Sequence, residues 1–304
     1  MKELFPMYGI ITTVLTPFNE DKSIDLPSFR KGIQAALDGG VAGFLVPCNA
    51  SEMPLLSWEE RKLLAEETVK IAKGKALVIP SVSDKGTDMD VTLQCREYLD
   101  LGVDGININI TYQSDEQYLR DVEKVDALKP PFIVLQDASM VDDGLSDDLI
   151  VRCFEEFETV RCIKIEVENS GPKYSRIYER TGGKMNISGA WGSSNSIEAY
   201  DRGIHAMMPS GLFELFVNVY KLYHEKSRDA AKKLFFDMLP IISFTRQDST
   251  LNRHFHKLYL KRIGVFENDF SREGYLFDEY HEKYANELID YALALRDRIP
   301  EYWK

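Results

Sequence analysis

A lysine lies in the middle of an apolar, strand-like run, within the sequence VRCIKIEVENSG at residues 160–171. Lysine is rarely buried without a partner, because removing an ammonium group from water favours the neutral amine. Glu166 and Glu168 would share the strand face of Lys164, so a structural ion pair is the simpler interpretation and, on this segment alone, the favoured one. A sheltered neutral amine is also what Schiff-base chemistry requires of a lysine. The position of Lys164 in the fold distinguishes a structural ion pair from a Schiff-base nucleophile.

Short apolar runs rich in valine and isoleucine alternate along the chain with segments of helical period. Strands that alternate with helices indicate parallel pairing through βαβ crossovers. No glycine-rich phosphate motif follows the first run, which disfavours a dinucleotide-binding fold. The pattern therefore predicts an α/β protein, a (β/α)₈ TIM barrel. Its strands are expected within residues 9–18, 43–49, 76–83, 105–110, 132–137, 160–166, 185–191 and 205–210.

Helix signals support this order of elements. Ser57 and Glu60 have the spacing of a capping box, and Gly74 follows the end of the same helical pattern. After residue 211 the pattern is helical only. We therefore predict a barrel domain over residues 1–225 and a helical segment, residues 226–304, packed on the barrel.

Barrel geometry gives Lys164 a direction. Active sites of these barrels lie at the carboxyl ends of the strands, and Lys164 is near the end of the sixth run. Strand alternation places Cys162, Lys164 and Glu166 on one face and Ile163 and Ile165 on the other. The isoleucines suit packing against the helices, so we expect Lys164 to face the barrel interior, with Glu166 at the rim in contact with water.

Four stretches carry a family resemblance by their order and spacing: TTVLTPFNEDKSID at 12–25, GGVAGFLVPCNASEMPLLSWEER at 39–61, LGVDGININITY at 101–112 and CIKIE at 162–166. The chain resembles the dihydrodipicolinate synthase/N-acetylneuraminate lyase family of class I, Schiff-base aldolases and lyases. The resemblance implies that Lys164 is the imine-forming nucleophile. It also implies that no cofactor is needed and that the protein is a homo-oligomer, a dimer or tetramer.

The substrate-binding turn departs from the family. The family's Gly-Thr-Thr-Gly-Glu, which holds the carboxylate of a 2-keto acid, corresponds here to Cys48-Asn49-Ala50-Ser51-Glu52. The resemblance implies that Asn49, Ala50 and Ser51 take this role, although the segment could equally be an ordinary loop. Glu166 and Gly189 complete the expected substrate-binding set; Gly189 has the family's position for close approach of backbone to a ligand.

The fifth run departs further. The family's proton-relay tyrosine corresponds to Gln136 in LQDAS, and the asparagine that follows corresponds to Asp137. Glutamine cannot act as an acid or base but aspartate can, so Asp137 is the expected relay beside Lys164. Tyr112 resembles the family's second tyrosine, which lies near a subunit interface. The expected catalytic set is Lys164, Asp137, Gln136 and Tyr112.

Three functions follow from these features. The first is a lyase or aldolase that forms an imine with a pyruvate-type 2-keto acid or a keto-deoxy sugar acid. The second is a dehydratase or hydratase that uses the same imine. The third is a non-catalytic barrel that binds a keto acid or sugar acid. Dihydrodipicolinate synthase activity itself is disfavoured, because SMVDDG at 139–144 lacks that enzyme's arginine.

Composition limits the partners. The net charge of −12 argues against nucleic acid or an anionic membrane as a partner. The four cysteines form no CxxC pair and the N-terminus lacks a signal-peptide core, so a cytoplasmic protein is expected. The five histidines are scattered, and no metal site is expected. The stretch RHFHKLYLKRIGVF at 253–266 is basic and aromatic; we favour an amphipathic helix with a solvated basic face over an anion site.

Overall fold

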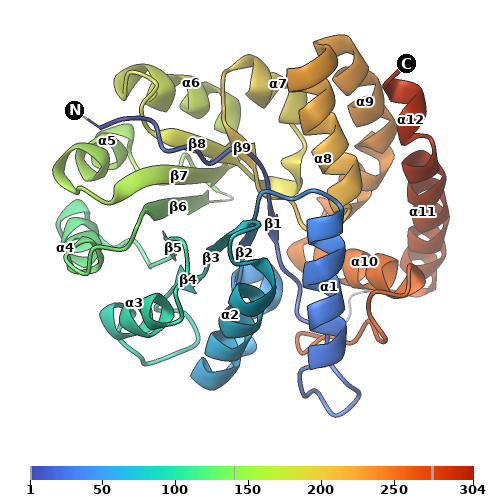
Figure 1. Cartoon of the computed structure of the whole chain (residues 1–304), viewed down its shortest axis with the longest axis horizontal. Helices are drawn as coiled ribbons and strands as arrows, with labels where there is room; N and C mark the ends of the chain where they lie inside the picture. Colours follow the sequence, from blue (N-terminus) through green and yellow to red (C-terminus); the bar gives the residue numbers. More distant parts are fainter. Residues whose placement is uncertain (1, 140, 275–276) are drawn as a thin grey trace.

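The computed structural model describes residues 2–139, 141–274 and 277–304 as a parallel β-barrel surrounded by helices (Figure 1). All strand pairings in its sheet are parallel, in the order β3-β2-β1-β9-β8-β7-β6-β5-β4. The strands are β1 Gly9–Thr13, β2 Gly43–Leu45, β3 Leu77–Ile79, β4 Ser81–Val82, β5 Ile106–Ile108, β6 Ile133–Ser139, β7 Val160–Val167, β8 Asn186–Gly189 and β9 Ala206–Met207.

The strands β3 and β4 are two parts of one barrel strand, interrupted at Pro80. They stand at the two ends of the strand order, so the chain itself joins the ends of the sheet. Backbone hydrogen bonds continue across the interruption, because the amide of Ser81 donates to Pro47 and that of Asn107 donates to Pro80. The predicted (β/α)₈ barrel is therefore confirmed, and each of the eight predicted runs contains a barrel strand.

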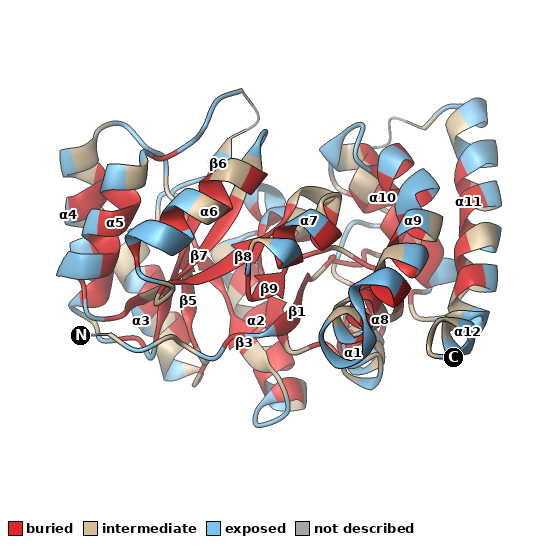
Figure 2. Cartoon of the chain, turned by 90° about the horizontal axis from the view of Figure 1, so that it is seen from above, coloured by how far each residue is buried: buried red, intermediate tan, exposed pale blue. Residues whose placement is uncertain are grey.

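Helices cover the outside of the strands, and Figure 2 shows that their inner sides are buried while the strands are buried almost throughout. Helix α2 begins after Ser57, whose hydroxyl accepts the amide of Glu60 while the Glu60 carboxylate accepts the amide of Ser57, as the capping box predicts. The barrel helices are α1 Leu26–Asp38, α2 Trp58–Ala72, α3 Val91–Asp100, α4 Asp115–Asp126, α5 Asp147–Glu156, α6 Ser170–Arg180, α7 Ser196–Asp201 and α8 Phe213–Lys221.

The core has two layers. Ile163 and Ile165 belong to the larger layer, between strands and helices, as the alternation of β7 predicts. Cys162 belongs to the smaller layer, whose members come from inward-facing strand positions and from the N-terminal segment; they include Met7, Ile11, Leu45, Ile79, Val134, Ala206 and Met208. Because the lower barrel is filled with apolar side chains, polar chemistry is confined to its upper mouth.

The C-terminal segment is helical and packs beside α8, at the end of the molecule where α1 also lies (Figure 1). A π-helical turn, Leu222–Lys226, leads to α9 Arg228–Thr245, α10 Ser249–Arg262, α11 Glu279–Asp297 and α12 Ile299–Tyr302. The Trp303 indole donates to Asn218 of α8 over 2.9 Å, and Arg272 pairs with Glu60 of α2 over 2.5 Å. Within the described parts of the chain, no helix combines the length and apolar character needed to cross a bilayer.

Candidate active site at the mouth of the barrel

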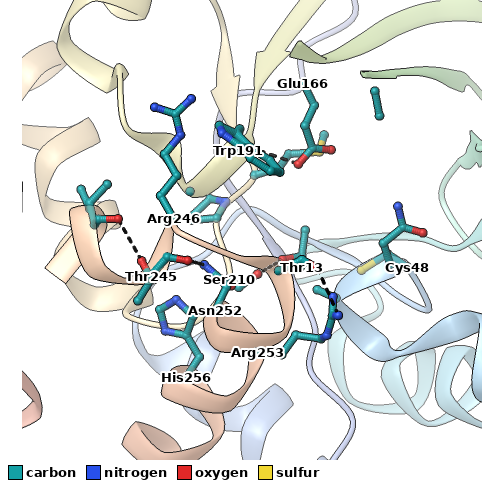
Figure 3. A pocket seen from close by; sticks show the side chains of 18 of the residues that line it. Thr13, Cys48, Glu166, Trp191, Ser210, Thr245, Arg246, Asn252, Arg253 and His256 are labelled. Atoms are coloured by element: carbon teal, nitrogen blue, oxygen red, sulfur yellow. Dashed lines mark hydrogen bonds between the residues drawn. The ribbon is translucent and has the colours of Figure 1, made fainter. Parts of the chain in front are cut away.

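A cavity of about 310 Å³ opens where the carboxyl ends of the strands face α9 and α10 (Figure 3). This volume is at the lower end of the range found for small-molecule sites, about 300–1,000 Å³. Strand ends supply Thr13, Lys164, Glu166 and Ser210, and the C-terminal helices supply Asn252 and His256. The cavity is therefore closed on one side by a part of the chain that lies outside the barrel.

Lys164 lies in β7 with its side chain directed into the barrel mouth and only 4% of the residue exposed. Its Nζ donates to Glu166 Oε2 over 2.7 Å. In the described chain, this is the only hydrogen bond that the ammonium group makes. The ion pair expected of a structural lysine is thus present, but it borders the cavity and leaves donor positions on Nζ unused.

Glu166 is held in place from three sides. Its Oε1 accepts the backbone amide of Trp191 over 3.2 Å, and the Gln136 amide lies 3.5 Å from its Oε2. Gln136 is in turn fixed by Asn107, whose side-chain amide donates to Gln136 Oε1 over 2.9 Å. The Glu166 side chain is 18% exposed, in keeping with the rim position predicted for it. Gln136 therefore supports the ion pair from below and does not itself line the cavity.

A strained turn after β8 brings Trp191 to the cavity. Trp191, Gly192 and Ser193 have successive φ values of 55°, 66° and 54°. A bulky residue in this left-handed region is uncommon, and such strain persists only where the surroundings impose it. The hydrogen bond from the Trp191 amide to Glu166 is one such restraint. The turn couples the position of the indole ring to the carboxylate beside Lys164.

Gly189, at the end of β8, has a packing role in this structure. A Cβ added there would lie 2.7 Å from Met207 Sδ and 2.8 Å from the Tyr174 hydroxyl, so no larger residue fits without movement of these neighbours. The expected close approach to the cavity is made instead by Trp191 and Gly192, which follow it in the chain.

The turn after β2 contributes two of its three predicted residues. Asn49 and Ala50 line the cavity within a one-turn 3₁₀ helix, Asn49–Ser51, and Asn49 Oδ1 accepts Asn109 Nδ2 over 3.1 Å. Ser51 is fully buried: its hydroxyl donates to the Val14 carbonyl over 2.5 Å and accepts the Cys48 amide over 3.1 Å. Ser51 therefore holds the turn together and is not available to a ligand.

The prediction that Asp137 lies beside Lys164 is wrong. In the parallel register Gln136 pairs with Lys164 and Asp137 with Ile165, so Asp137 points out of the barrel. Its carboxylate lies 2.6 Å from Nζ of Lys173 in α6 and accepts the amide of Leu145 over 2.8 Å. Burial raises the pKa of Asp137, against the lowering effect of the Lys173 charge. Asp137 thus belongs to a structural ion pair behind the strand.

Tyr112 is also away from the cavity. The residue is 50% exposed, and its hydroxyl donates to Asp115 over 2.9 Å at the start of α4. This hydrogen bond to a carboxylate raises the pKa of the Tyr112 phenol. Within one chain Tyr112 therefore takes no part in the site.

Helix α10 shows what the sequence patterns missed. The interpretation of residues 253–266 as a helix with a solvated basic face is wrong for Arg253 and Lys257, which are buried. Lys257 pairs with Glu52 after the β2 turn, and Arg253 pairs with Glu273, with Nε 2.8 Å from the carboxylate. The Lys257–Glu52 pair anchors α10 against the barrel mouth, and the Arg253–Glu273 pair joins α10 to the segment that follows it. His256 consequently borders the cavity, where burial lowers its pKa to about 3.

Comparison with known proteins agrees with this architecture. Residues 6–113 match the sequence profile of the Dihydrodipicolinate synthetase family. The chain is 39% identical over 111 residues to 4-hydroxy-tetrahydrodipicolinate synthase of Leptospira biflexa, over 36% of this chain and 37% of that protein. The chain thus spans just over a third of that relative's length. Lys164 lies outside the segment matched by the family profile, so its assignment depends on the geometry above.

Two solved structures share the fold over nearly the whole chain. The crystal structure of dihydrodipicolinate synthase from Rhodopseudomonas palustris superposes with a TM-score of 0.83 at 24% identity, covering 97% of this chain and all of that one. The sialic acid aldolase of Ruminococcus gnavus superposes with a TM-score of 0.85 at 17% identity, with coverage of 97% and 100%. At these identities the superpositions establish the fold, including the C-terminal helices.

Proposed function

The chain belongs to the dihydrodipicolinate synthetase family, and on this premise we propose that it is a lyase or aldolase that forms a Schiff base between Lys164 and a pyruvate-type 2-keto acid. One observation carries the proposal. Lys164 is a buried lysine at the end of a barrel strand whose ammonium group borders the cavity and has donor positions to spare. A nucleophile needs this combination of shelter and access.

Glu166 supplies the proton transfers in this proposal. Its carboxylate takes a proton from the Lys164 ammonium over the 2.7 Å contact, which leaves a neutral amine that attacks the C2 carbonyl carbon. The resulting carbinolamine loses its hydroxyl as water when Glu166 returns the proton. Glu166, again a carboxylate, then takes the proton of a hydroxyl on C4; the C3–C4 bond breaks and its electron pair moves to the protonated imine, giving an enamine and an aldehyde, and the reverse sequence joins them.

In this proposal, the carboxylate of the keto acid binds at the turn after β2. Asn49 and the backbone of Ala50 line the cavity there, and the Asn49 side-chain amide has donors to offer. Ser51 is left out because its hydroxyl already serves Val14 and Cys48.

A dehydratase is the second candidate. The nearest acid–base group to the imine nitrogen is a carboxylate and not the tyrosine of related lyases. A carboxylate can remove a proton from C3 of the bound imine, so that a hydroxyl at C4 leaves as water without release of an aldehyde. Product analysis with a 4-hydroxy-2-keto acid separates the two: an aldehyde indicates the lyase, and loss of water alone indicates the dehydratase.

Borohydride reduction in the presence of pyruvate tests the imine directly. We expect an adduct on the wild type by intact mass, located at Lys164 by peptide mapping, and none on Lys164→Ala. Lys85→Ala is the matched control, because Lys85 also lines the cavity but is exposed. If pyruvate and larger 2-keto acids leave the wild type unlabelled, imine chemistry is refuted and a non-catalytic binding barrel takes its place. Equal labelling of Lys164→Ala would identify another lysine.

A further inference from the structure

A second cation borders the cavity and is not used by the proposed chemistry. Arg246 follows α9 and contributes its guanidinium to the cavity wall, with Cζ 5.7 Å from the centre of the Trp191 ring. Across the residues that the structure describes, this guanidinium makes no hydrogen bond and no ion pair. Arg253, in the same wall, instead pairs with Glu273. An arginine in a cavity without a carboxylate partner has all its planar donors available for an anion.

The position of Arg246 relative to Lys164 is set by the strained turn. The Trp191 backbone amide and the Lys164 ammonium group both donate to the Glu166 carboxylate. The Arg246 guanidinium packs against the ring of Trp191. In the view of Figure 3, Glu166, Trp191 and Arg246 follow one another across the pocket. An anion bound by Arg246 would therefore lie beyond Trp191 as seen from Glu166, where the far end of a ligand that starts at Lys164 could reach it.

The surroundings of Arg246 favour a single carboxylate. Asp248 also lines the cavity, two residues after Arg246 in the chain, but its carboxylate caps α10 by accepting the amides of Thr250 and Leu251 over 2.7 and 3.2 Å. Burial lowers the pKa of Arg246, opposed by the charge of Glu168. Arg246 remains a cation at neutral pH, since arginine does not deprotonate in proteins. One partly desolvated guanidinium matches one carboxylate in both charge and geometry.

We propose that Arg246, placed by its packing on Trp191, binds a second carboxylate at the far end of the substrate, so that the preferred substrates are dicarboxylic 2-keto acids. This inference rests on the proposed imine at Lys164 and adds the substrate class. The two carboxylates have different partners: the one beside the keto group lies at the turn of Asn49, and the distal one lies at Arg246.

Two keto acids of equal length test the proposal. 2-Oxoglutarate and 2-oxopentanoate each have five carbons and differ at the far end, which is a carboxylate in one and a methyl group in the other. We expect half-maximal borohydride trapping of the wild type at a concentration about tenfold or more lower for 2-oxoglutarate, the size typical of one charged hydrogen-bonded contact. Arg246→Met should abolish this preference, and Arg246→Lys should keep part of it.

Arg262→Met is the matched control, because Arg262 lies in α10 but pairs on the surface with Asp290 over 2.9 Å. It should retain the full preference for 2-oxoglutarate. Equal trapping of both keto acids by the wild type, or an undiminished preference in Arg246→Met, overturns the proposal.

A ligand without a keto group separates this inference from the proposed reaction. Glutarate cannot form an imine, so its binding is independent of Lys164 chemistry. We expect glutarate to raise the melting temperature of the wild type and of Lys164→Ala, but not that of Arg246→Met. If no keto acid is trapped while glutarate still stabilises through Arg246, the imine fails and the carboxylate site stands. Glutarate stabilisation that survives Arg246→Met contradicts the carboxylate site.

Discussion

Two buried lysine–carboxylate pairs lie on opposite faces of the same pair of strands, and only one of them borders the cavity. Lys164 and Glu166 meet inside the barrel mouth over 2.7 Å, and Asp137 and Lys173 meet behind β6 over 2.6 Å. Lys164 and Lys173 are both almost completely buried. Burial and ion pairing alone therefore do not distinguish a candidate nucleophile from a structural lysine.

The difference lies in the remaining donors. Lys173 also donates to the backbone carbonyls of Asp143 and Leu145, so its ammonium group has three close oxygen neighbours, and it does not border the cavity. Lys164 has Glu166 alone among the described residues, and the cavity faces its free side. A lysine with every donor satisfied stabilises the fold, whereas one with unused donors at a cavity can react.

A third pair follows the structural pattern. Lys257 and Glu52 are both completely buried, and Lys257 also donates to the Phe270 carbonyl over 2.9 Å. Burial alone would raise the pKa of Glu52. The charge of Lys257 and hydrogen bonds outweigh this effect and hold the pKa below its ordinary value. This pair joins the β2 turn to α10 and so closes the cavity without entering the chemistry.

The largest expected effect comes from changing the carboxylate of the reactive pair. Glu166→Gln keeps the shape of the side chain but removes the acid–base group, so turnover should fall by about 10²- to 10⁴-fold. The exchange of the C3 protons of pyruvate for deuterium, followed by NMR, measures this without knowledge of the second substrate. Asp137→Asn is the control and should exchange at nearly the wild-type rate. Full exchange activity in Glu166→Gln would remove Glu166 from the mechanism.

Breaking the Asp137–Lys173 pair should reduce stability and leave the chemistry at Lys164 intact. Lys173→Met leaves Asp137 buried without a cation, so the free energy of unfolding should drop by about 3–5 kcal/mol in urea titrations at neutral pH. Pyruvate labelling at Lys164 should persist at temperatures where the variant is folded. The double variant Asp137→Leu/Lys173→Met should recover much of the loss, because no unpaired charge remains. A stable Lys173→Met that loses labelling would reverse the roles assigned to the two pairs.

His256 is a buried base in the cavity wall. Its Nδ1 has no hydrogen-bond partner among the described residues, unlike the paired lysines above. Burial lowers its pKa to about 3 in the folded protein, against about 6.5 in the unfolded chain. The unfolded chain therefore binds the proton first, and stability present above about pH 6.5 is lost as pH falls toward 3. The free energy of unfolding should fall by up to about 1.4 kcal/mol per pH unit in this window.

Urea titrations between pH 7 and 5 measure this slope, and His256→Gln should make it shallower. An unchanged slope in that variant would assign the acid sensitivity to other groups, such as the buried carboxylates.

The smallest effect is expected at an exposed residue. Tyr112→Phe removes only the hydroxyl that donates to Asp115, so the midpoint of urea unfolding should stay at the wild-type value. Deuterium exchange of pyruvate should be unchanged if each chain works alone. We propose that the protein is a homo-oligomer, dimer or tetramer, which light scattering can test. Reduced exchange without reduced stability would indicate that Tyr112 reaches the site of a neighbouring subunit.

Local sequence determined the elements and the direction of Lys164. The alternation of Cys162, Lys164 and Glu166 with Ile163 and Ile165 needs only the geometry of one strand, and the structure places these side chains as predicted. The start of α2 at Ser57 was equally local, since a cap depends on residues three positions apart.

Only the tertiary structure decided which of Gln136 and Asp137 faces Lys164 and what closes the cavity. The strand segment IVLQD is buried on both faces, as parallel barrel strands are, so no alternation of hydrophobicity reveals its inward side. The register with β7 does. Arg246 and His256 reach the site from helices far along the chain, held by Lys257 against Glu52. Contacts between such distant segments depend on packing and leave no periodic signal in the sequence.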